Sequence, residues 1–349
     1  MNERTGFTLA CPAPETDGSR IELAHGGGGR LTAQLIETLF RPAFARSETD
    51  LTHDGALLEI GGARLAFTTD SYVVQPIFFP GGDIGSLAVN GTINDLAMCG
   101  ARPVAISAGF VIEEGLAMAD LKRIVTSMQS AAEAAGASLV TGDTKVVERG
   151  KGDGIYVNCS GIGEVVAPSP VVPGRLRPGD AILISGDIGR HGMAIMAARE
   201  NLGFAPPIES DCAPLAAPVL RMIDHGLDLH CLRDLTRGGL ATALVEIART
   251  ARISIQIEQS AVPVSAPVRG ACEILGIDPL YVANEGRFIA FVPPGQAEAA
   301  LSILGSFDAG AAMIGTVEGE CGAGSVNLRT LGGTYALDLM TGEQMPRIC

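Results

Sequence analysis

The chain has 349 residues, of which 47% are hydrophobic and 18% charged, so it can bury large cores and is not broadly disordered. Its net charge of −14 argues against a nucleic-acid partner, and no apolar run is long enough to span a membrane. The eight cysteines lack zinc-site spacing and follow no signal peptide, which predicts a cytoplasmic protein, and the length predicts about two domains.

The first half predicts a glycine-rich loop followed by a mixture of helices and strands. Regularly spaced leucines after the loop indicate a helix, and Gly61-Gly62 between two apolar runs indicates a hairpin. Asp83 suits the N-cap of a helix that ends near Met98. After a lead-in of residues 1–24, we expect a loop at 25–30, a helix from 31, strands at 56–60 and 64–69, a helix at 83–98, a strand at 103–112, a helix at 121–132, and strands near 138–141 and 154–162.

Four prolines between residues 167 and 180 predict a domain boundary. Beyond it, strands at 181–185, 253–257 and 287–292 alternate with helices at 191–200 and 234–249, which is typical of an α/β domain. Gly-Asp-Ile-Gly occurs at 82–85 and again at 186–189, weak support for two related halves. The expected organisation is an N-terminal domain at 25–167, a C-terminal α/β domain at 168–335, and a flexible tail at 336–349 that carries Cys349.

Acidic and amide side chains gather at the expected ends of strands and helices. Asp70 ends a strand, Asp83 opens a helix, and Thr141-Gly142-Asp143 end a further strand. Any one of them alone would be an ordinary cap or turn residue. Together they offer the oxygen ligands that Mg²⁺ prefers and the backbone N–H groups that bind phosphate, which predicts a Mg-ATP site.

The helix that begins at Asp83 carries three further candidates. Asn90 and Asn94 fall within about 20° of the helix face of Asp83 and are expected to contact ATP. Asp95 lies about 120° from that face, so as a metal ligand it would have to act near the helix end.

The glycine-rich loop and a nearby lysine offer further contacts with phosphate. Gly26 to Gly29 present consecutive backbone N–H groups and suit a flap over a nucleotide, although a flexible surface loop is an equal alternative. The loop is neither a Walker motif nor a dinucleotide fingerprint. Lys145, close to Asp143, would neutralise phosphate or act as a base, unless it is a surface lysine in a turn.

The second half adds two carboxylates and a cysteine. Asp234 precedes Leu-Thr-Arg-Gly-Gly and suits a metal ligand or a helix cap, and Glu285 stands just before a buried strand. The sequence closes with Met-Pro-Arg-Ile-Cys. Fully extended, residues 336–349 would span on the order of 45 Å, so the tail could carry the thiol of Cys349 into a site of its own or a neighbouring subunit. The alternative is an incidental exposed thiol.

These residues together resemble the superfamily of aminoimidazole ribonucleotide synthetase and selenophosphate synthetase, and within it most closely the HypE family of hydrogenase maturation proteins. The resemblance covers nearly the whole chain, and the ending Pro-Arg-Ile-Cys is its most specific part. The matching segments are His25 to Gly29, Thr69 to Ser71, Phe78 to Gly85, Asn94 to Ala97, Glu113 to Gly115, Gly142 to Val147, Gly186 to Gly189, Asp234 to Leu240, and Asn284 to Gly286.

The resemblance implies a fold, a reaction and partners. The fold would be α/β (α+β), with an N-terminal sheet that forms a barrel across a homodimer and a C-terminal α/β sandwich domain. HypF would place a carboxamide on the Cys349 sulfur, and the chain would dehydrate it with ATP to a thiocyanate. The cyano group would pass to iron on a HypC–HypD complex, for NiFe hydrogenase.

The resemblance also implies roles for the candidates. Cys349 would be the covalent carrier, and Glu285 and Lys145 are the candidate bases, without a choice between them. Asp70, Asp83, Asp95, Asp143 and Asp234 would hold Mg²⁺ and ATP.

Two other functions fit parts of the pattern. A selenophosphate synthetase would need a reactive cysteine followed by a lysine near the glycine loop, and Cys11 has no such neighbour; thiamine monophosphate kinase is a similar rival. A non-catalytic scaffold that binds ATP is the third possibility, against which the crowded carboxylates and Lys145 argue.

Overall fold

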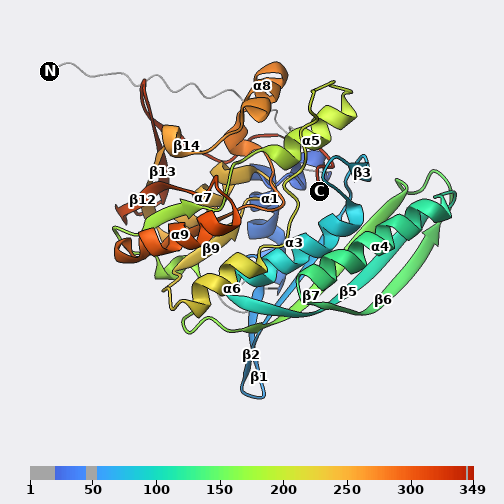
Figure 1. The fold of residues 1–349 in the computed structure, drawn as a ribbon, viewed down its shortest axis with the longest axis horizontal. Coiled ribbons are helices and arrows are strands. Elements are labelled where there is room, and N and C mark those ends of the chain that lie inside the picture. The colour runs from blue at the N-terminus through green and yellow to red at the C-terminus, as the bar shows by residue number, and fades with distance from the viewer. Residues whose placement is uncertain (1–19, 45–52, 343–344) are drawn as a thin grey trace.

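The computed structural model describes residues 20–44, 53–342 and 345–349, which contain two large β-sheets and the helices packed on them (Figure 1). The expected mixture of helices and strands in two domains is confirmed. Among the described residues, no helix is both long and apolar enough to cross a bilayer.

The N-terminal domain is built on a five-stranded sheet in the order β1-β2-β7-β5-β6. Helices α3 and α4 lie along one face of this sheet (Figure 1). Strand β6 is an edge strand. Within the described part of the chain it pairs with β5 alone, and it is exposed along nearly its whole length. The elements are β1 (Ala56–Ile60), β2 (Ala63–Tyr72), β3 (Phe78–Phe79), β4 (Gly82–Asp83), α3 (Ile84–Met98), β5 (Ala101–Glu113), α4 (Met118–Ala134), β6 (Ser138–Val147) and β7 (Ile155–Val165).

The C-terminal domain is built on a seven-stranded sheet in the order β14-β13-β10-β12-β8-β11-β9, with helices on both faces. Its central strands β8 and β11 are buried on both sides, as their continuous apolar sequences require. The elements are β8 (Ala181–Ile184), α5 (Arg190–Arg199), α6 (Ala216–Asp224), β9 (Cys231–Asp234), α7 (Gly239–Ala251), β10 (Ile253–Glu258), α8 (Ala266–Leu275), β11 (Phe288–Val292), α9 (Ala297–Phe307), β12 (Ala312–Glu320), β13 (Ser325–Thr330) and β14 (Gly333–Leu337).

Helix α3 joins the two domains. It packs on β2, β5 and β7 of its own sheet and on α6 and β9 of the other domain, so nearly every residue in it is buried. A helix buried all round has no polar stripe, which matches its apolar sequence. One continuous core therefore runs across the domain boundary, from Ile84 and Leu87 to Val219 and Leu232.

The helices and strands expected from the sequence are all present. Strand β6 is longer than expected, and β3, β4, β9, β12 to β14, α6, α8 and α9 had no counterpart among the expectations. The helix expected from residue 31 consists of α1 (Arg30–Leu35), a π-helical turn (Ile36–Phe40) and α2 (Arg41–Phe44). The domain bounds stay predictions, and the expected lead-in lies largely outside the described residues. Ala336 and Leu337 of the expected tail belong to β14.

Candidate functional site

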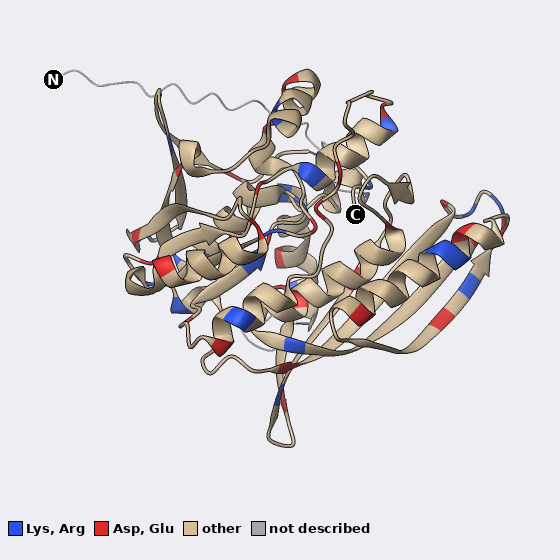
Figure 2. Ribbon diagram, viewed as in Figure 1, with Lys and Arg blue, Asp and Glu red and all other residues tan. Residues whose placement is uncertain are grey.

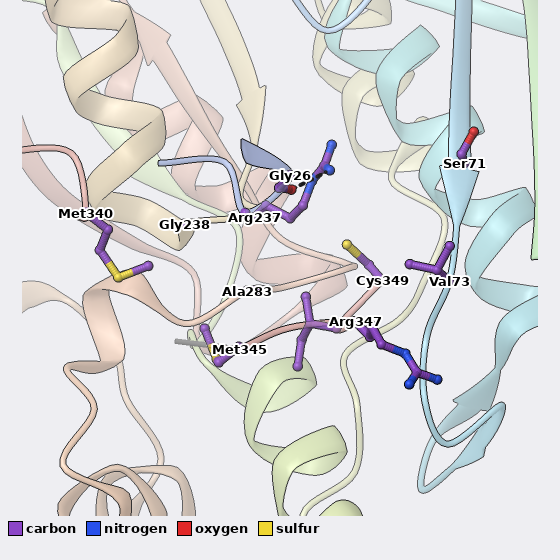
Figure 3. Close-up of a pocket in the computed structure, with 12 residues that line it drawn as sticks. Gly26, Ser71, Val73, Arg237, Gly238, Ala283, Met340, Met345, Arg347 and Cys349 are labelled. Atoms are coloured by element: carbon purple, nitrogen blue, oxygen red, sulfur yellow. Dashed lines mark hydrogen bonds between the residues drawn. The ribbon is translucent and has the colours of Figure 1, made fainter. Parts of the chain in front are cut away.

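The last residues of the chain line a small cavity at the junction of the two domains. The cavity has a volume of about 90 Å³, enough for a few small atoms but not for a nucleotide. It is lined from both domains by Gly26, Gly27, Ser71, Val73, Arg237, Gly238, Ala283, Met340, Met345, Arg347, Ile348 and Cys349. In Figure 3 the Cys349 sulfur points toward Arg237 and Gly26, whereas the Arg347 side chain points away. Cys349 and the first two glycines of the glycine loop thus line the same cavity within one chain.

The thiol of Cys349 lies against the carboxyl group of Glu285. Burial, and then Glu285, raise the thiol pKa well above the ordinary cysteine value. The Glu285 side chain is buried, and its Oε1 atom has no hydrogen-bond partner. Burial and the charges of Asp234, Asp70 and Asp211 raise the pKa of Glu285, whereas Arg237 lowers it. A carboxyl group with a raised pKa beside a sulfur is suited to accept a proton from a group carried on that sulfur.

Arg237 connects the sulfur to the glycine loop. Its guanidinium Nη1 donates to the carbonyl oxygen of Gly26 at 3.0 Å, and the charge of Cys349 is the largest influence that raises its pKa. Gly28 has a φ of +76°, and a Cβ there would come within 2.8 Å of the Arg237 Cβ, so the loop requires glycine at this close approach. The glycine loop therefore forms part of the cavity wall, and Arg237 holds it there.

Three carboxylates form a cluster at the same junction. Oxygen atoms of Asp54, Asp95 and Asp234 lie within 4.8 Å of one another. Asp95 comes from α3 and Asp234 from the end of β9, and Thr68 donates to Asp95 Oδ2 at 2.7 Å. Burial and mutual repulsion raise the pKa of Asp95 and of Asp234 well above the ordinary value, and Asp70 adds to both shifts. An oxygen of Asp54 and one of Asp234 have no hydrogen-bond partner. Crowded hard oxygens with unused lone pairs fit a divalent cation such as Mg²⁺.

Other predicted ligands on α3 are engaged elsewhere. Asp83 caps the helix, and its Oδ1 accepts hydrogen bonds from Gly85 N, Ser86 N and Ser127. Asn94 accepts from Leu215 N at 2.7 Å and donates to the Ala213 carbonyl, so it links the two domains. The amide of Asn90 faces the sulfur of Cys212 at 3.5 Å. Their assignment as Mg²⁺ or ATP ligands stays a prediction.

The remaining candidates lie on the exposed edge strand. Lys145 pairs with Asp143 at 2.9 Å, and both side chains are largely exposed. Figure 2 shows both acidic and basic residues along this strand. Asp70 on β2, Cys159 on β7, Ala108 on β5 and Gly142 on β6 lie in one row across the sheet. Three strand spacings make about 14 Å, so Thr141, Gly142, Asp143 and Lys145 are not brought next to the carboxylate cluster of the same chain.

Sequence reasoning missed three residues of this region. Asp54 joins the carboxylate cluster and pairs with Arg233 at 2.8 Å; its only signal was its place just before the hairpin. Arg237 was named within its motif without a role. His191, completely buried, contacts the carbonyl oxygen of Ile348 at 2.8 Å, and nothing in the sequence paired these two.

Comparisons with known proteins agree with this geometry. A family model described as AIR synthase related protein, N-terminal domain, matches residues 52–165, and the corresponding C-terminal domain model matches residues 177–326. The chain is 50% identical to carbamoyl dehydratase HypE of Azotobacter vinelandii over 333 residues, which cover 94% of this chain and 97% of that protein.

Two crystal structures are also similar. One, of HypE in complex with ATP, shares 47% identity with a TM-score of 0.80 and covers 94% of this chain and 99% of its own. The other, of a HypE–HypF complex, shares 45% identity with a TM-score of 0.82 and covers 88% of this chain and 99% of its own.

Proposed function

Because this chain belongs to the AIR synthase related family and, within it, to the HypE carbamoyl dehydratases, we propose that it uses ATP to dehydrate a carboxamide on the sulfur of Cys349. The product is a thiocyanate whose cyano group becomes the cyanide ligand of NiFe hydrogenase iron. The observation that carries the proposal is that the Cys349 thiol lines a small cavity at the domain junction and has the Glu285 carboxyl group beside it.

The reaction proceeds in two steps at the carboxamide, phosphorylation of its oxygen and elimination of phosphate. Its oxygen attacks the γ-phosphorus of ATP and displaces ADP, while one N–H proton leaves, which gives an O-phosphorylated imidate on sulfur. The second N–H proton then leaves, the C–O bond breaks, and inorganic phosphate departs from the resulting nitrile. An amide oxygen is a poor leaving group, and phosphorylation makes it a good one, so positioning and charge neutralisation carry most of the catalysis.

Glu285 is the base that we assign to at least one of these protons. Its carboxyl group touches the sulfur that carries the carboxamide, and its burial makes it a stronger base than an exposed carboxylate. Arg237, which lines the same cavity as the thiol, is placed to stabilise negative charge on the carboxamide oxygen. Lys145 remains the second candidate base.

Asp54, Asp95 and Asp234 would hold Mg²⁺, and Asp70 lies close enough to contribute charge. Bound Mg²⁺ neutralises phosphate charge during transfer. Asp83 and Asp143 stay in the proposal as further ligands, and the glycine loop, with Asn90, Asn94, Thr141 and Gly142, as ATP contacts.

The proposal includes partners and a compartment. HypF, found in complex with a HypE of known structure, would load the carboxamide, and a HypC–HypD complex would accept the cyano group. A homodimer is supported by the open edge of the N-terminal sheet, where β6 exposes Leu139, Val140 and Val146. Cytoplasm is the proposed compartment, because a cysteine that carries a substrate must stay reduced.

Incubation with HypF, carbamoyl phosphate and ATP tests the function directly. The mass of the C-terminal peptide should rise by one carboxamide and then fall by one water when ATP is present. Cys349→Ala should give neither change and should keep ATP binding nearly intact. A carboxamide that forms on Cys349 but never loses water would overturn the dehydratase proposal.

A further inference from the structure

The start of helix α5 contacts both the tail that carries Cys349 and the segment that carries Glu285. His191 Nε2 lies 2.8 Å from the carbonyl oxygen of Ile348, the residue before the cysteine. In the next position, Gly192 N donates to the carbonyl oxygen of Ala283 at 3.0 Å, and Gly189 N donates to Asn284 Oδ1 at 2.7 Å. The segment that carries Glu285 and the tail that carries Cys349 are thus held by one rigid element.

The hydrogen bonds around His191 fix its protonation state. A carbonyl oxygen only accepts, so Nε2 must carry the proton that reaches Ile348. Nδ1 then accepts from the hydroxyl of Ser210 at 2.8 Å, and Ser210 in turn accepts from Cys212 N at 3.0 Å. Burial lowers the pKa of His191, which keeps the ring neutral, and the edge of the Phe79 ring packs against it. The imidazole is therefore a fixed donor.

The segment that orients His191 also contacts Glu285. Asp211, next to Ser210, faces the Glu285 backbone N–H at 3.5 Å, and Ala213 N donates to the Glu285 carbonyl oxygen at 3.3 Å. A chain of contacts consequently runs from the Ile348 carbonyl through His191 and Ser210 to Glu285.

The other contacts of the tail also involve its backbone. Arg199, at the far end of α5, donates to the carbonyl oxygens of Pro346 at 2.7 Å and Arg347 at 3.0 Å. Val73 N and Gln75 N donate to the carbonyl oxygens of Cys349 and Arg347. Arg347 has a φ of +57°, a left-handed conformation that is disfavoured for any residue other than glycine. The docked tail therefore depends on these donors to hold a disfavoured turn.

We propose that His191 is the positioning residue of the tail: its Nε2–H holds the Ile348 carbonyl so that the Cys349 sulfur stays against Glu285. This rests on the proposed function, because it assigns a purpose to that juxtaposition. His191 does not touch the reacting atoms. Its donor contacts the residue before the cysteine, and its ring is also connected through Ser210 to the segment that contacts Glu285.

Alkylation of Cys349 in the full-length protein tests the positioning without any reaction. Iodoacetamide reaches the sulfur when the tail leaves the cavity, and mass spectrometry of the C-terminal peptide gives the rate. His191→Leu, of similar volume but without a donor, should raise that rate about five- to tenfold, the equilibrium factor of one hydrogen bond. His191→Gln, which keeps a terminal N–H donor, should remain within about twofold of the wild type.

Internal controls separate release of the tail from general loosening. Cys99, Cys159 and Cys231 are buried far along the chain from the tail, and their alkylation rates should not change in either variant. An unchanged Cys349 rate in His191→Leu, or an equal rise in His191→Gln, would overturn the proposal. If His191→Leu does not fold, the ring nitrogen signals of the wild type decide, because a protonated Nδ1 or a charged ring at neutral pH contradicts the hydrogen-bond assignment.

A second readout connects the positioning to the reaction. In His191→Leu, loading of the carboxamide by HypF should proceed at the wild-type rate, whereas the ATP-dependent loss of water should slow by the same factor, with recovery in His191→Gln. The alkylation result does not depend on ATP or HypF. If the dehydratase assay fails but alkylation changes as expected, the proposed function is rejected and the positioning role of His191 is kept. If dehydration occurs but alkylation does not change as expected, only the positioning role is rejected.

Discussion

The residues predicted to form one site lie in two very different places. Asp234 and Glu285 are buried and Asp95 is half-buried at the junction of the domains, where neighbouring carboxylates raise one another's pKa. Asp143 and Lys145 are exposed on the edge strand β6 and pair with each other. Within one chain, three strand spacings, about 14 Å, separate Gly142 on β6 from Asp70 on β2, the strand of this sheet whose carboxylate acts on the buried group.

The difference teaches that the electrostatic cost of burying carboxylates is a better guide to a functional site than the presence of charged residues alone. Buried like charges destabilise the folded chain unless a ligand uses them, so such a cluster persists for function. An exposed lysine–aspartate pair costs almost nothing and carries no such information. Exposure alone therefore gives no reason to place Asp143 and Lys145 in a site. A dimer with adjoining sheet edges would give one, because it would bring them to the site of the partner subunit.

Glu285→Gln tests the buried group with the largest expected effect. Removal of the base should slow the dehydration step by at least about a hundredfold, as is typical for general base catalysis. Single-turnover mass spectrometry of the carboxamide-loaded protein measures it, and loading by HypF serves as the control. A loss of less than about threefold would remove Glu285 from catalysis.

Asp234→Asn addresses the carboxylate cluster. A neutral amide is a poorer Mg²⁺ ligand, so the Mg²⁺ concentration needed for ATP binding should rise by about tenfold or more. Calorimetry of ATP binding at several Mg²⁺ concentrations measures this. Asp83→Asn is the matched comparison, since asparagine keeps the helix cap. Unchanged affinity in Asp83→Asn would exclude Asp83 as a Mg²⁺ ligand. Unchanged affinity in Asp234→Asn would exclude the carboxylate cluster as the Mg²⁺ site.

A subunit mixture sharpens the comparison between the two places. Lys145→Ala and Glu285→Gln should each be inactive or slow alone. If the edge strand serves the partner's site, refolded one-to-one mixtures should regain about a quarter of the wild-type activity, since half of the dimers then contain one intact site. No recovery, with dimers demonstrated by sedimentation, would place both residues in the site of one subunit.

The pH dependence of Cys349 alkylation gives the smallest effect. Burial and Glu285 raise the thiol pKa, so the reactive thiolate should form only above the ordinary cysteine value of about 8.5. Between pH 7 and 9 the wild-type rate should lie several-fold below that of a free peptide with the same last five residues. A midpoint at or below the peptide's would show that the thiol is not held in the cavity.

The sequence was sufficient for most local structure and for the kinds of residue in the site. Apolar periodicity and turn residues located most of the longer strands and helices up to residue 292, because these signals are local, but they did not reveal α6, β9 or α8. It did not reveal that the Asn94 amide would contact the other domain, since periodicity gives the face of a helix but not what packs there. Asp54 was missed for the same reason, because only the fold brings it to Asp95 and Asp234.

The repeated Gly-Asp-Ile-Gly illustrates this limit. At 82–85, Asp83 caps α3 with its carboxylate. At 186–189, Asp187 instead pairs with Arg287 and Arg190, and Gly189 takes the cap position with a φ of +88°. Both segments precede a helix, as their residue types predict, yet the same aspartate has different partners because the surrounding chain differs.

Helix α3 has a consequence for how the molecule folds. The apolar surface of α3 packs against both domains, so neither domain alone can complete its own core. Residues 53–165 produced by themselves would expose one side of the helix to water. The whole chain should unfold in a single cooperative transition, with a calorimetric enthalpy equal to the van't Hoff value. Two units defined by sequence are thus expected to be one thermodynamic unit.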